Sequence, residues 1–348
     1  MKSLIIIEPW CCHYEILPSI IDSTKDIYKD YIILSEDNVS SKHAIEFLEN
    51  ENNIYITDNI FQILSYNSSF DIWLNTSHKH GSEESFHQTT FVINSIREKA
   101  RIYNIFCVIH NKIDQKWLAY QLSNQSFSQK VIAVYLSNDS KDAYAVNTFS
   151  IIFRPYCLDV PNLIPNYLAD TTCIKLAIVG MCRAGKRFSE LYRFNDLINE
   201  GKIEFVYSGW APKATRINSG IKEAITNGYV SQCLMAEHRI KDIDVHEFLN
   251  KQHAIVDLKI IEDSWPIGLS SGNIGISRAL RMPLIAHERH YPDFHCIRFT
   301  NYSDLHKLLS DHNRITQILK RHRSKLLNEY GETKVLARHA ILNIQNTN

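Results

Sequence analysis

Short runs of apolar residues alternate with longer amphipathic stretches through the first half of the chain. The runs are rich in Ile and Val and are bounded by polar turns, which is typical of strands buried on both faces. They are Leu4–Ile7, Tyr31–Leu34, Ile54–Ile56, Phe70–Leu74, Ile105–Ile109 and Val131–Val134. Helices are predicted over His43–Asn50 and Ser82–Arg101, the second with Ser82 as its N-cap. This alternation predicts a parallel sheet covered by helices on both faces.

The pattern changes at residues 153–172, where FRPYCLDVPNLIPNYLADTT holds three prolines and no helical period. Such a segment is typical of a linker between domains. A second series follows, with strands at Lys175–Val179, Ile203–Tyr207, Ala254–Ile260, Pro283–Ala286 and Cys296–Phe299. Its predicted helices are Phe188–Asn199, Ile274–Arg281, Ser303–Asp311 and Arg314–Tyr330. We therefore predict an α/β protein of two doubly wound domains.

Length and composition agree with two ordinary globular domains. The chain has 348 residues, with 38 basic and 38 acidic side chains and a formal net charge of zero, so global charge gives no argument for nucleic-acid binding. Its start, MKSLIIIEPW, is too short for a signal-peptide core, and no stretch reaches the roughly 18 apolar residues of a membrane span. Eight cysteines without a C-x-x-C pair are typical of reduced thiols. We expect a cytoplasmic location, with association at the inner face of a membrane left open.

Glycine is unevenly distributed. Of eleven glycines only Gly81 precedes residue 180. Because glycine is needed where the backbone takes positive φ or approaches a ligand closely, the second half is where we expect binding loops made by the backbone.

Two loops of the second half could hold an anion. VGMCRAGKRFSEL, directly after a predicted strand, combines Gly180 with the cations Arg183 and Lys186. SSGNIGISRALRMPLIAH opens a short helix whose first backbone amides belong to Ser271, Gly272, Asn273 and Ile274. In open α/β sheets such loops lie beyond the carboxyl ends of the strands, where helix N-termini bind anions. Singly, each loop is also explained as a structural turn, whereas together they favour a phosphate-bearing ligand.

The first loop nearly matches a P-loop. GMCRAGKR fits G-x-x-x-x-G-K, but Arg187 stands where the magnesium-binding Ser or Thr belongs. Asp257 is a weak match for the second carboxylate of such a site. A P-loop NTPase therefore remains a minor alternative.

The second half resembles the donor-binding domain of GT-B-fold glycosyltransferases, especially the group called family 4. VGMCRAGKRFSEL is similar to their loop with Arg and Lys, and FVYSGWAPK, which contains Gly209, is similar to a following small-residue turn. SSGNIGISRALRMPLIAH resembles their diphosphate-binding turn and helix, with Arg281 replacing the usual glycine. The resemblance implies two Rossmann-like domains facing a cleft. It assigns residues 1–160 to acceptor binding, 161–173 to a linker, 174–330 to donor binding and 331–348 to a tail or helix that could cross back to the first domain.

One departure from this family concerns its paired glutamates, which are eight residues apart. They are absent, and Ile276 occupies the place of the second. Glu262 and Asp263 lie upstream and could hold a ribose or sugar hydroxyl, and Trp265 is either a base-stacking or a core side chain. Retention or inversion of the anomeric configuration is left open.

In a GT-B enzyme the first domain supplies the catalytic group. In EPWCCHYEILPS, His13 and Glu15 follow the first strand and could accept a proton from an acceptor hydroxyl. His110 in IHNKID is a second candidate, at a place where GT-B enzymes often carry His-Asn. The histidines of TSHKHGSEESFH match no standard zinc spacing, so we predict a cleft-facing loop there and no metal site.

The resemblance implies a metal-independent glycosyltransferase without a cofactor. Its substrates would be a nucleotide-sugar donor and a glycan or glycolipid acceptor, such as growing lipopolysaccharide or capsule. No nucleic-acid partner is expected, and peripheral membrane association stays open. The alternative of a different class is a nucleotide-binding module without catalysis, because a fold does not fix chemistry.

Overall fold

The structure is a computed structural model. It describes residues 2–8, 16–48, 53–59, 69–77, 86–124, 129–136, 138–153, 168, 172–182, 184–211, 213, 219–237, 240–260, 272–291 and 294–345. The chain divides into two compact units. The first contains Met1–Pro155 and Thr333–Asn348, and the second contains Tyr156–Glu332.

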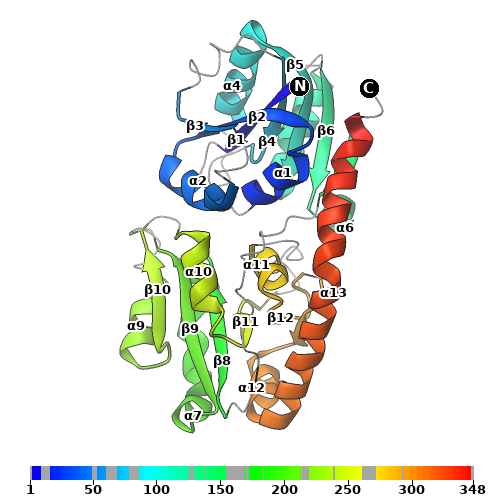
Figure 1. Ribbon diagram of the computed structural model, residues 1–348. Helices are drawn as coiled ribbons and strands as arrows, with labels where there is room; N and C mark the ends of the chain where they lie inside the picture. The colour runs from blue at the N-terminus through cyan, green and yellow to red at the C-terminus, as the bar shows by residue number, and fades with distance from the viewer. Residues whose placement is uncertain are drawn as a thin grey trace. The chain divides into compact units, whose positions relative to one another are not determined.

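The first unit is built on a seven-stranded parallel sheet in the order β3-β2-β1-β4-β5-β6-β7 (Figure 1). The strands are β1 (Lys2–Glu8), β2 (Tyr28–Ser35), β3 (Asn53–Thr57), β4 (Ser69–Leu74), β5 (Arg101–Ile109), β6 (Lys130–Tyr135) and β7 (Phe149–Ile152). The helices are α1 (Leu17–Thr24), α2 (Asn38–Ile45), α4 (Phe86–Lys99), α5 (Lys112–Ser123) and α6 (Asn138–Ala143). Strand order reverses at β1, so the switch point lies between β1 and β4.

The second unit has a six-stranded parallel sheet in the order β10-β9-β8-β11-β12-β13. Its strands are β8 (Ile174–Val179), β9 (Ile203–Trp210), β10 (Gln232–Ala236), β11 (Ala254–Asp257), β12 (Leu284–His287) and β13 (Ile297–Phe299). Its helices are the 3₁₀ segments η4 (Ala184–Lys186) and η5 (Phe188–Phe194), with α7 (Asn195–Asn199), α9 (Ile221–Thr226), α10 (Asp242–Leu249), α11 (Gly272–Leu280) and α12 (Tyr302–Ser310). Here the order reverses between β8 and β11.

Both sheets are buried on their two faces, which explains the continuous apolar runs in their central strands. In β1, Leu4–Ile7 are fully buried. In β8, Leu176 and Ile178 pack into one core cluster, whereas Ala177 and Val179 pack into another. The period of two along a strand thus divides its side chains between two helical layers.

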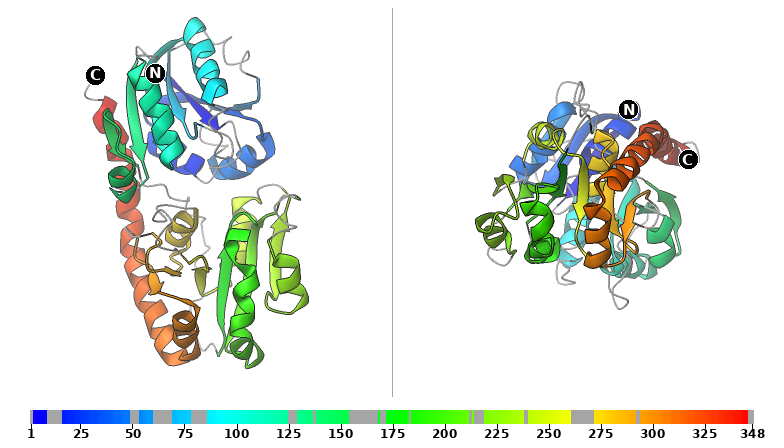
Figure 2. Two further views of the ribbon diagram at one scale, coloured as in Figure 1. Left: turned by 180° about the vertical axis from the view of Figure 1, so that it is seen from behind. Right: turned by 90° about the horizontal axis from the view of Figure 1, so that it is seen from below.

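The last helix, α13 (His312–Gln345), has 34 residues and is drawn unbroken in Figure 2. Its part up to Glu332 groups with the second unit, and the part from Thr333 groups with the first. In the latter part Ala337 and Ile341 are buried one turn apart, and Arg338 forms an ion pair with Asp26. No helix among the described residues is long and apolar enough to cross a membrane.

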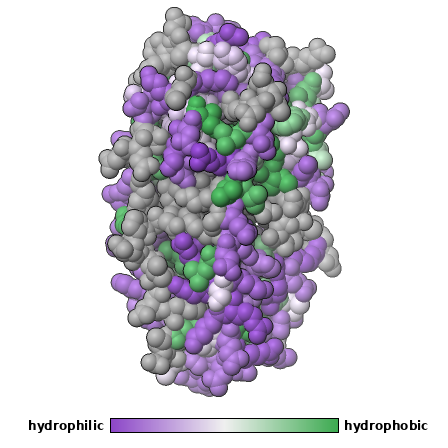
Figure 3. Space-filling view, turned by 45° about the vertical axis from the view of Figure 1, so that its right-hand side comes forward, coloured by the Kyte–Doolittle hydropathy of each residue, from purple (hydrophilic) through white to green (hydrophobic). Residues whose placement is uncertain are grey.

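The side of the molecule shown in Figure 3 is mainly hydrophilic, with apolar residues gathered in a few areas. Among the large apolar side chains that are exposed in the first unit are Phe149 on β7 and Val335 and Leu336 on α13. These side chains lie on an edge strand and on a terminal helix, where less of the fold covers them.

The predicted α/β class with two doubly wound sheets is confirmed. Several boundaries differ from the prediction, and the helix predicted over Phe188–Asn199 is divided into the 3₁₀ segment η5 and the helix α7. The helix predicted over His43–Asn50 begins at Asn38 instead, because Asp37 caps it by accepting a hydrogen bond from the Ser40 amide at 2.9 Å. The strand predicted over Ala254–Ile260 ends at Asp257, and the last helix continues beyond Tyr330 to Gln345.

Candidate functional site

Gly180 marks the switch point of the six-stranded sheet, directly after β8. Its φ of +101° lies in the region that favours glycine, and its amide donates to the Ser208 carbonyl at 3.0 Å. The turn therefore stays close to β9 as the chain leaves the sheet.

Gly209, a second predicted site residue, belongs to β9 and not to a turn after it. A Cβ atom at Gly209 would lie well under 3.0 Å from the carbonyl oxygen of Gly180, a distance that real Cβ atoms do not show. The Tyr207 hydroxyl donates to the same carbonyl at 2.7 Å. The two glycines thus allow the turn after β8 to contact the backbone of β9.

Lys186 brings a cation to this turn. It ends η4, and its ammonium group donates to the carbonyl of Val179, the last residue of β8. Its Nζ would lie 3.3 Å from a Cβ atom at Gly180. The amine is therefore folded back over the carboxyl end of β8, where the absence of a side chain at position 180 leaves room for it.

The N-terminus of α11 lies at the same edge, because this helix leads back to the start of the parallel strand β12. Its first residue is Gly272, and the side chain of Ile274 is buried in a core cluster. Asn273 donates from Nδ2 to Asp257 Oδ2 at 3.4 Å. The first amides of the helix can bind an anion, and the two neighbouring side chains fix the position of the helix.

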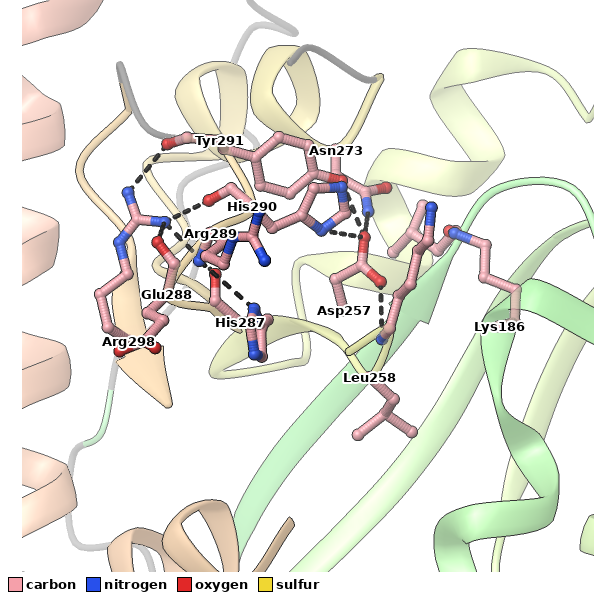
Figure 4. Close-up of polar contacts among 12 residues, drawn as sticks. Lys186, Asp257, Leu258, Asn273, His287, Glu288, Arg289, His290, Tyr291 and Arg298 are labelled. Atoms are coloured by element: carbon pink, nitrogen blue, oxygen red, sulfur yellow. Dashed lines mark hydrogen bonds and ion pairs between the residues drawn. The ribbon is translucent and has the colours of Figure 1, made fainter. Parts of the chain in front are cut away.

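Asp257, at the carboxyl end of β11, connects several segments of the second unit (Figure 4). The Tyr291 hydroxyl donates to Oδ2 at 2.7 Å, and the Lys259 amide donates to Oδ1 at 3.2 Å. His290 Nδ1 lies 3.5 Å from Oδ2. In the sequence, Asp257 is marked only as a weak match to a P-loop carboxylate, and no local pattern marks His290 or Tyr291.

The charges of this cluster follow from its burial. Asp257 is only 8% exposed, and burial alone would raise the pKa of its carboxyl group. The Lys186 charge, His290 and the Tyr291 hydrogen bond outweigh burial and hold that pKa below its usual value. Burial lowers the pKa of His290 to about 4. Near neutral pH the cluster therefore contains an ionised Asp257 and a neutral His290.

Arg298, on β13, fixes the segment that carries His290 and Tyr291. Its guanidinium group donates to the carbonyl of Tyr291 at 2.8 Å, to that of Phe294 at 2.8 Å, and to that of His290. Tyr291 has a φ of +54°, which an aromatic residue rarely adopts. The rigid fork of one arginine thus holds an unfavourable backbone conformation in place.

The first unit has a polar network at its own switch point. Asn75, directly after β4, donates from its amide to the Ile7 carbonyl at 2.9 Å and from its side chain to Glu8. Glu8 and Asn75 are fully buried. A carboxylate and an amide therefore meet where β1 and β4 end.

His110 joins this network from the end of β5. Its Nε2 lies 2.8 Å from the Asn75 carbonyl oxygen, which only accepts hydrogen bonds, so Nε2 carries the proton. Its backbone amide donates to Asp114 Oδ2 at 3.1 Å. In the neutral imidazole the lone pair is then on Nδ1, the atom that could accept a proton.

Asp114 lies in the first turn of α5, which begins after the N-cap Asn111. The Asn111 side chain accepts from the amides of Ile113 and Asp114. Asp114 then accepts from the Ser77 hydroxyl at 2.5 Å and from the Ser77 amide at 3.2 Å. The helix start thus links the segments that follow β4 and β5.

Several predicted residues lie outside the described part of the chain. They are His13, Glu15, His78, His80, Arg183, Glu262, Asp263, Trp265 and Ser271. His87 is described and is exposed on α4. Within the described ranges, no group of three or more His, Cys, Asp and Glu side chains could hold a metal ion.

No protein-family model matches the sequence, and no curated protein matches it either. The fold, however, resembles solved structures over nearly the whole chain. HepE of Anabaena, in complex with UDP and glucose, gives a TM-score of 0.68 at 9% identity, covering 99% of this chain and 100% of that one. A glycosyltransferase from Rickettsia africae gives 0.61 at 11% identity, covering 99% and 97%. A UDP-forming trehalose-phosphate synthase from Burkholderia vietnamiensis gives 0.55 at 9% identity, covering 100% and 98%.

Proposed function

We propose that this chain, which has the GT-B fold, is a glycosyltransferase that takes its sugar from a UDP-sugar donor. The observation that carries the proposal is the arrangement at the switch point of the six-stranded sheet. There the Lys186 amine and the first amides of α11 lie at one edge, as a diphosphate requires. HepE and an alpha-glucosyltransferase of similar fold were solved with UDP, which supports this choice of nucleotide.

In this proposal the donor diphosphate is neutralised by the protein itself. Lys186 and Arg183 supply positive charge, while the amides of Ser271 to Ile274 supply hydrogen-bond donors. As the sugar leaves, negative charge builds up on the diphosphate, and fixed donors at that position stabilise the transition state. Glu262 would bind a ribose or sugar hydroxyl. No divalent cation is needed for these roles.

The catalytic group is assigned to the carboxyl edge of the first unit's sheet. His110 is supported by its place at the end of β5, where the contact of 2.8 Å between its Nε2 and the Asn75 carbonyl oxygen orients the imidazole ring. His13 and Glu15 follow β1 and are the further candidates for this role. We propose a carbohydrate acceptor of a cell-surface polysaccharide, such as lipopolysaccharide or capsule.

A nucleotide panel tests the donor. The melting temperature is measured with UDP, GDP, dTDP, CMP and ATP, each with magnesium and with EDTA. A ligand at about a hundred times its Kd adds about 2.7 kcal/mol of stability, which is readily seen as a shift. We expect UDP to stabilise the chain equally in EDTA. Stabilisation by ATP only, and only with magnesium, would contradict the proposal and favour a P-loop NTPase.

A nucleotide-binding module without turnover is the second candidate, because Ile276 stands where family-4 enzymes carry a glutamate. His110→Ala distinguishes the two. In an enzyme it should reduce the release of UDP from a UDP-sugar and leave UDP affinity unchanged. A chain that binds UDP, but releases none from any UDP-sugar with acceptor glycans present, would be a binding module.

A further inference from the structure

One carboxylate joins three segments beside the proposed diphosphate site. Asp257 ends β11, Asn273 lies in the first turn of α11, and Tyr291 follows β12. The tyrosine hydroxyl and the Asn273 amide group both donate to Oδ2, at 2.7 and 3.4 Å (Figure 4). Asp257 therefore connects the start of α11 to Tyr291, which is 34 residues away from Asp257 in sequence.

The backbone conformation of Tyr291 is also fixed. Its φ of +54° is unfavourable, and the Arg298 guanidinium group holds the carbonyl of this residue at 2.8 Å. Tyr291 is also fully buried. Its hydroxyl group consequently has one fixed direction, which is toward Asp257.

The charge of Asp257 has the wrong sign for a direct role in binding a diphosphate. The carboxylate lies within electrostatic reach of Lys186, whose charge lowers the pKa of Asp257. By Coulomb's law alone, removing this negative charge should strengthen the binding of an anion at the same edge. A positioning role predicts the opposite, since a displaced α11 would no longer aim its amides at the phosphates.

We propose that Asp257 is a positioning residue. Tyr291, whose backbone Arg298 holds, fixes Asp257 so that it positions the first turn of α11 for the donor diphosphate. This inference rests on the proposed function. We call the set of Asp257, Asn273, Tyr291 and Arg298 the α11 clamp.

The first unit offers a matched control. Tyr28 donates from its hydroxyl to Asp71 Oδ2 at 2.8 Å, and both residues are buried. Asp71 lies near the start of β4, at the amino edge of its sheet. The changes Tyr291→Phe and Asp257→Asn can thus be compared with Tyr28→Phe and Asp71→Asn, which alter the same kind of buried hydrogen bond.

The experiment measures the melting temperature and the Kd for UDP of the four variants by calorimetry in EDTA. We expect all four to melt at lower temperature. Only the two clamp variants should bind UDP more weakly, by about tenfold, which corresponds to about 1.4 kcal/mol. With a UDP-sugar as substrate, they should raise the donor KM more than they lower kcat.

Two results would overturn the inference, and they differ from each other. In the first, the clamp variants melt at lower temperature but bind UDP as tightly as the unchanged chain, or more tightly. This result would show that Asp257 only stabilises the fold. An unchanged chain that binds no UDP would refute the UDP-sugar function, and the positioning role with it. Tyr291→Phe removes one oxygen atom only, so it keeps the test valid if Asp257→Asn does not fold.

Discussion

Arg281 occupies a backbone position that normally favours glycine. It follows α11 with a φ of +49°, its amide donates to the Arg278 carbonyl at 3.2 Å, and the Met282 amide donates to the Ser277 carbonyl at 2.9 Å. This is the hydrogen-bond pattern of a Schellman motif, whose left-handed residue is usually glycine. Arg281 thus adopts the left-handed conformation that usually requires glycine.

We expect Arg281→Gly to stabilise the second unit. A non-glycine residue in the left-handed region costs about 1–2 kcal/mol, and the greater freedom of glycine in the unfolded chain offsets part of this, so the net gain should be about 1 kcal/mol. Urea unfolding measures it. The control is Arg281→Ala, which keeps the Cβ atom and should give no gain. Equal stability of the two variants would show that Cβ strain is absent.

At Gly209 a side chain is excluded by a close contact with neighbouring atoms, and not by the backbone φ angle. Gly209→Ala would push a Cβ atom into the Gly180 carbonyl, which is backbone and cannot rotate away. Overpacking of this kind costs about 1–3 kcal/mol. We expect this loss together with weaker UDP binding, because the turn that carries Lys186 must shift. The control is Gly228→Ala, where nothing lies within 4 Å of the added atom and only the φ of +73° is strained. Unchanged UDP affinity in Gly209→Ala would argue against a link between Gly209 and the donor site.

At the scale of elements, the central strands were predictable because they are apolar and buried on both faces. β7 and β10 were missed for the opposite reason: the side chains of FSII and QCLMA are partly or fully exposed, so they carry no buried pattern. The helices α1 and α6 have only eight and six residues, too few to show a clear period.

The residues of the candidate site were predictable where their positions are set within a single loop. Gly180, Lys186 and Gly272 could be predicted, because glycine and charged residues stand next to apolar runs at these places in the sequence. The contact between Asp257 and Tyr291 was not predictable, because it depends on a left-handed tyrosine that Arg298 holds in place. No local pattern marks Tyr291 for that conformation, since glycine or asparagine would be expected there.

The end of α13 provides a prediction about one element. Residues 333–345 group with the first unit, where Ala337 and Ile341 are buried. Truncation after Glu332 exposes the surface that they cover, so we expect the first unit to melt at lower temperature and the second to change little. Differential scanning calorimetry separates the two transitions. An unchanged first transition after truncation at Glu332 would contradict this account.

At the scale of the whole molecule, buried histidines make stability depend on pH. Burial lowers the pKa values of His253 and His290 to about 4, and in His290 the charges of Lys259 and Lys186 add to this against the opposing charge of Asp257. Between about pH 6.5 and 4 the unfolded chain therefore binds more protons than the folded one, and stability falls as the pH falls. His290 alone should account for about 3 kcal/mol across that range.

Urea unfolding at pH 7.5, 6 and 5 measures this slope. His253→Asn should reduce this slope. The Lys175 amide donates a hydrogen bond to His253 Nδ1 at 2.9 Å, and an asparagine side chain can still accept that bond but does not titrate. Stability that stays constant between pH 7 and 5 would contradict the neutral, buried state of these histidines.

The central claim, that a donor diphosphate binds at the switch point of the six-stranded sheet, is tested most directly by calorimetric titration of UDP in EDTA. The unchanged chain is compared with Lys186→Met and with Lys202→Met, whose lysine is 44% exposed, lies 2.7 Å from Glu200 and precedes β9 at the amino edge of the sheet. Losing a charge-assisted hydrogen bond to phosphate should weaken UDP binding in Lys186→Met by about 10- to 100-fold, while Lys202→Met stays unchanged. Equal UDP affinity in all three proteins would contradict the claim.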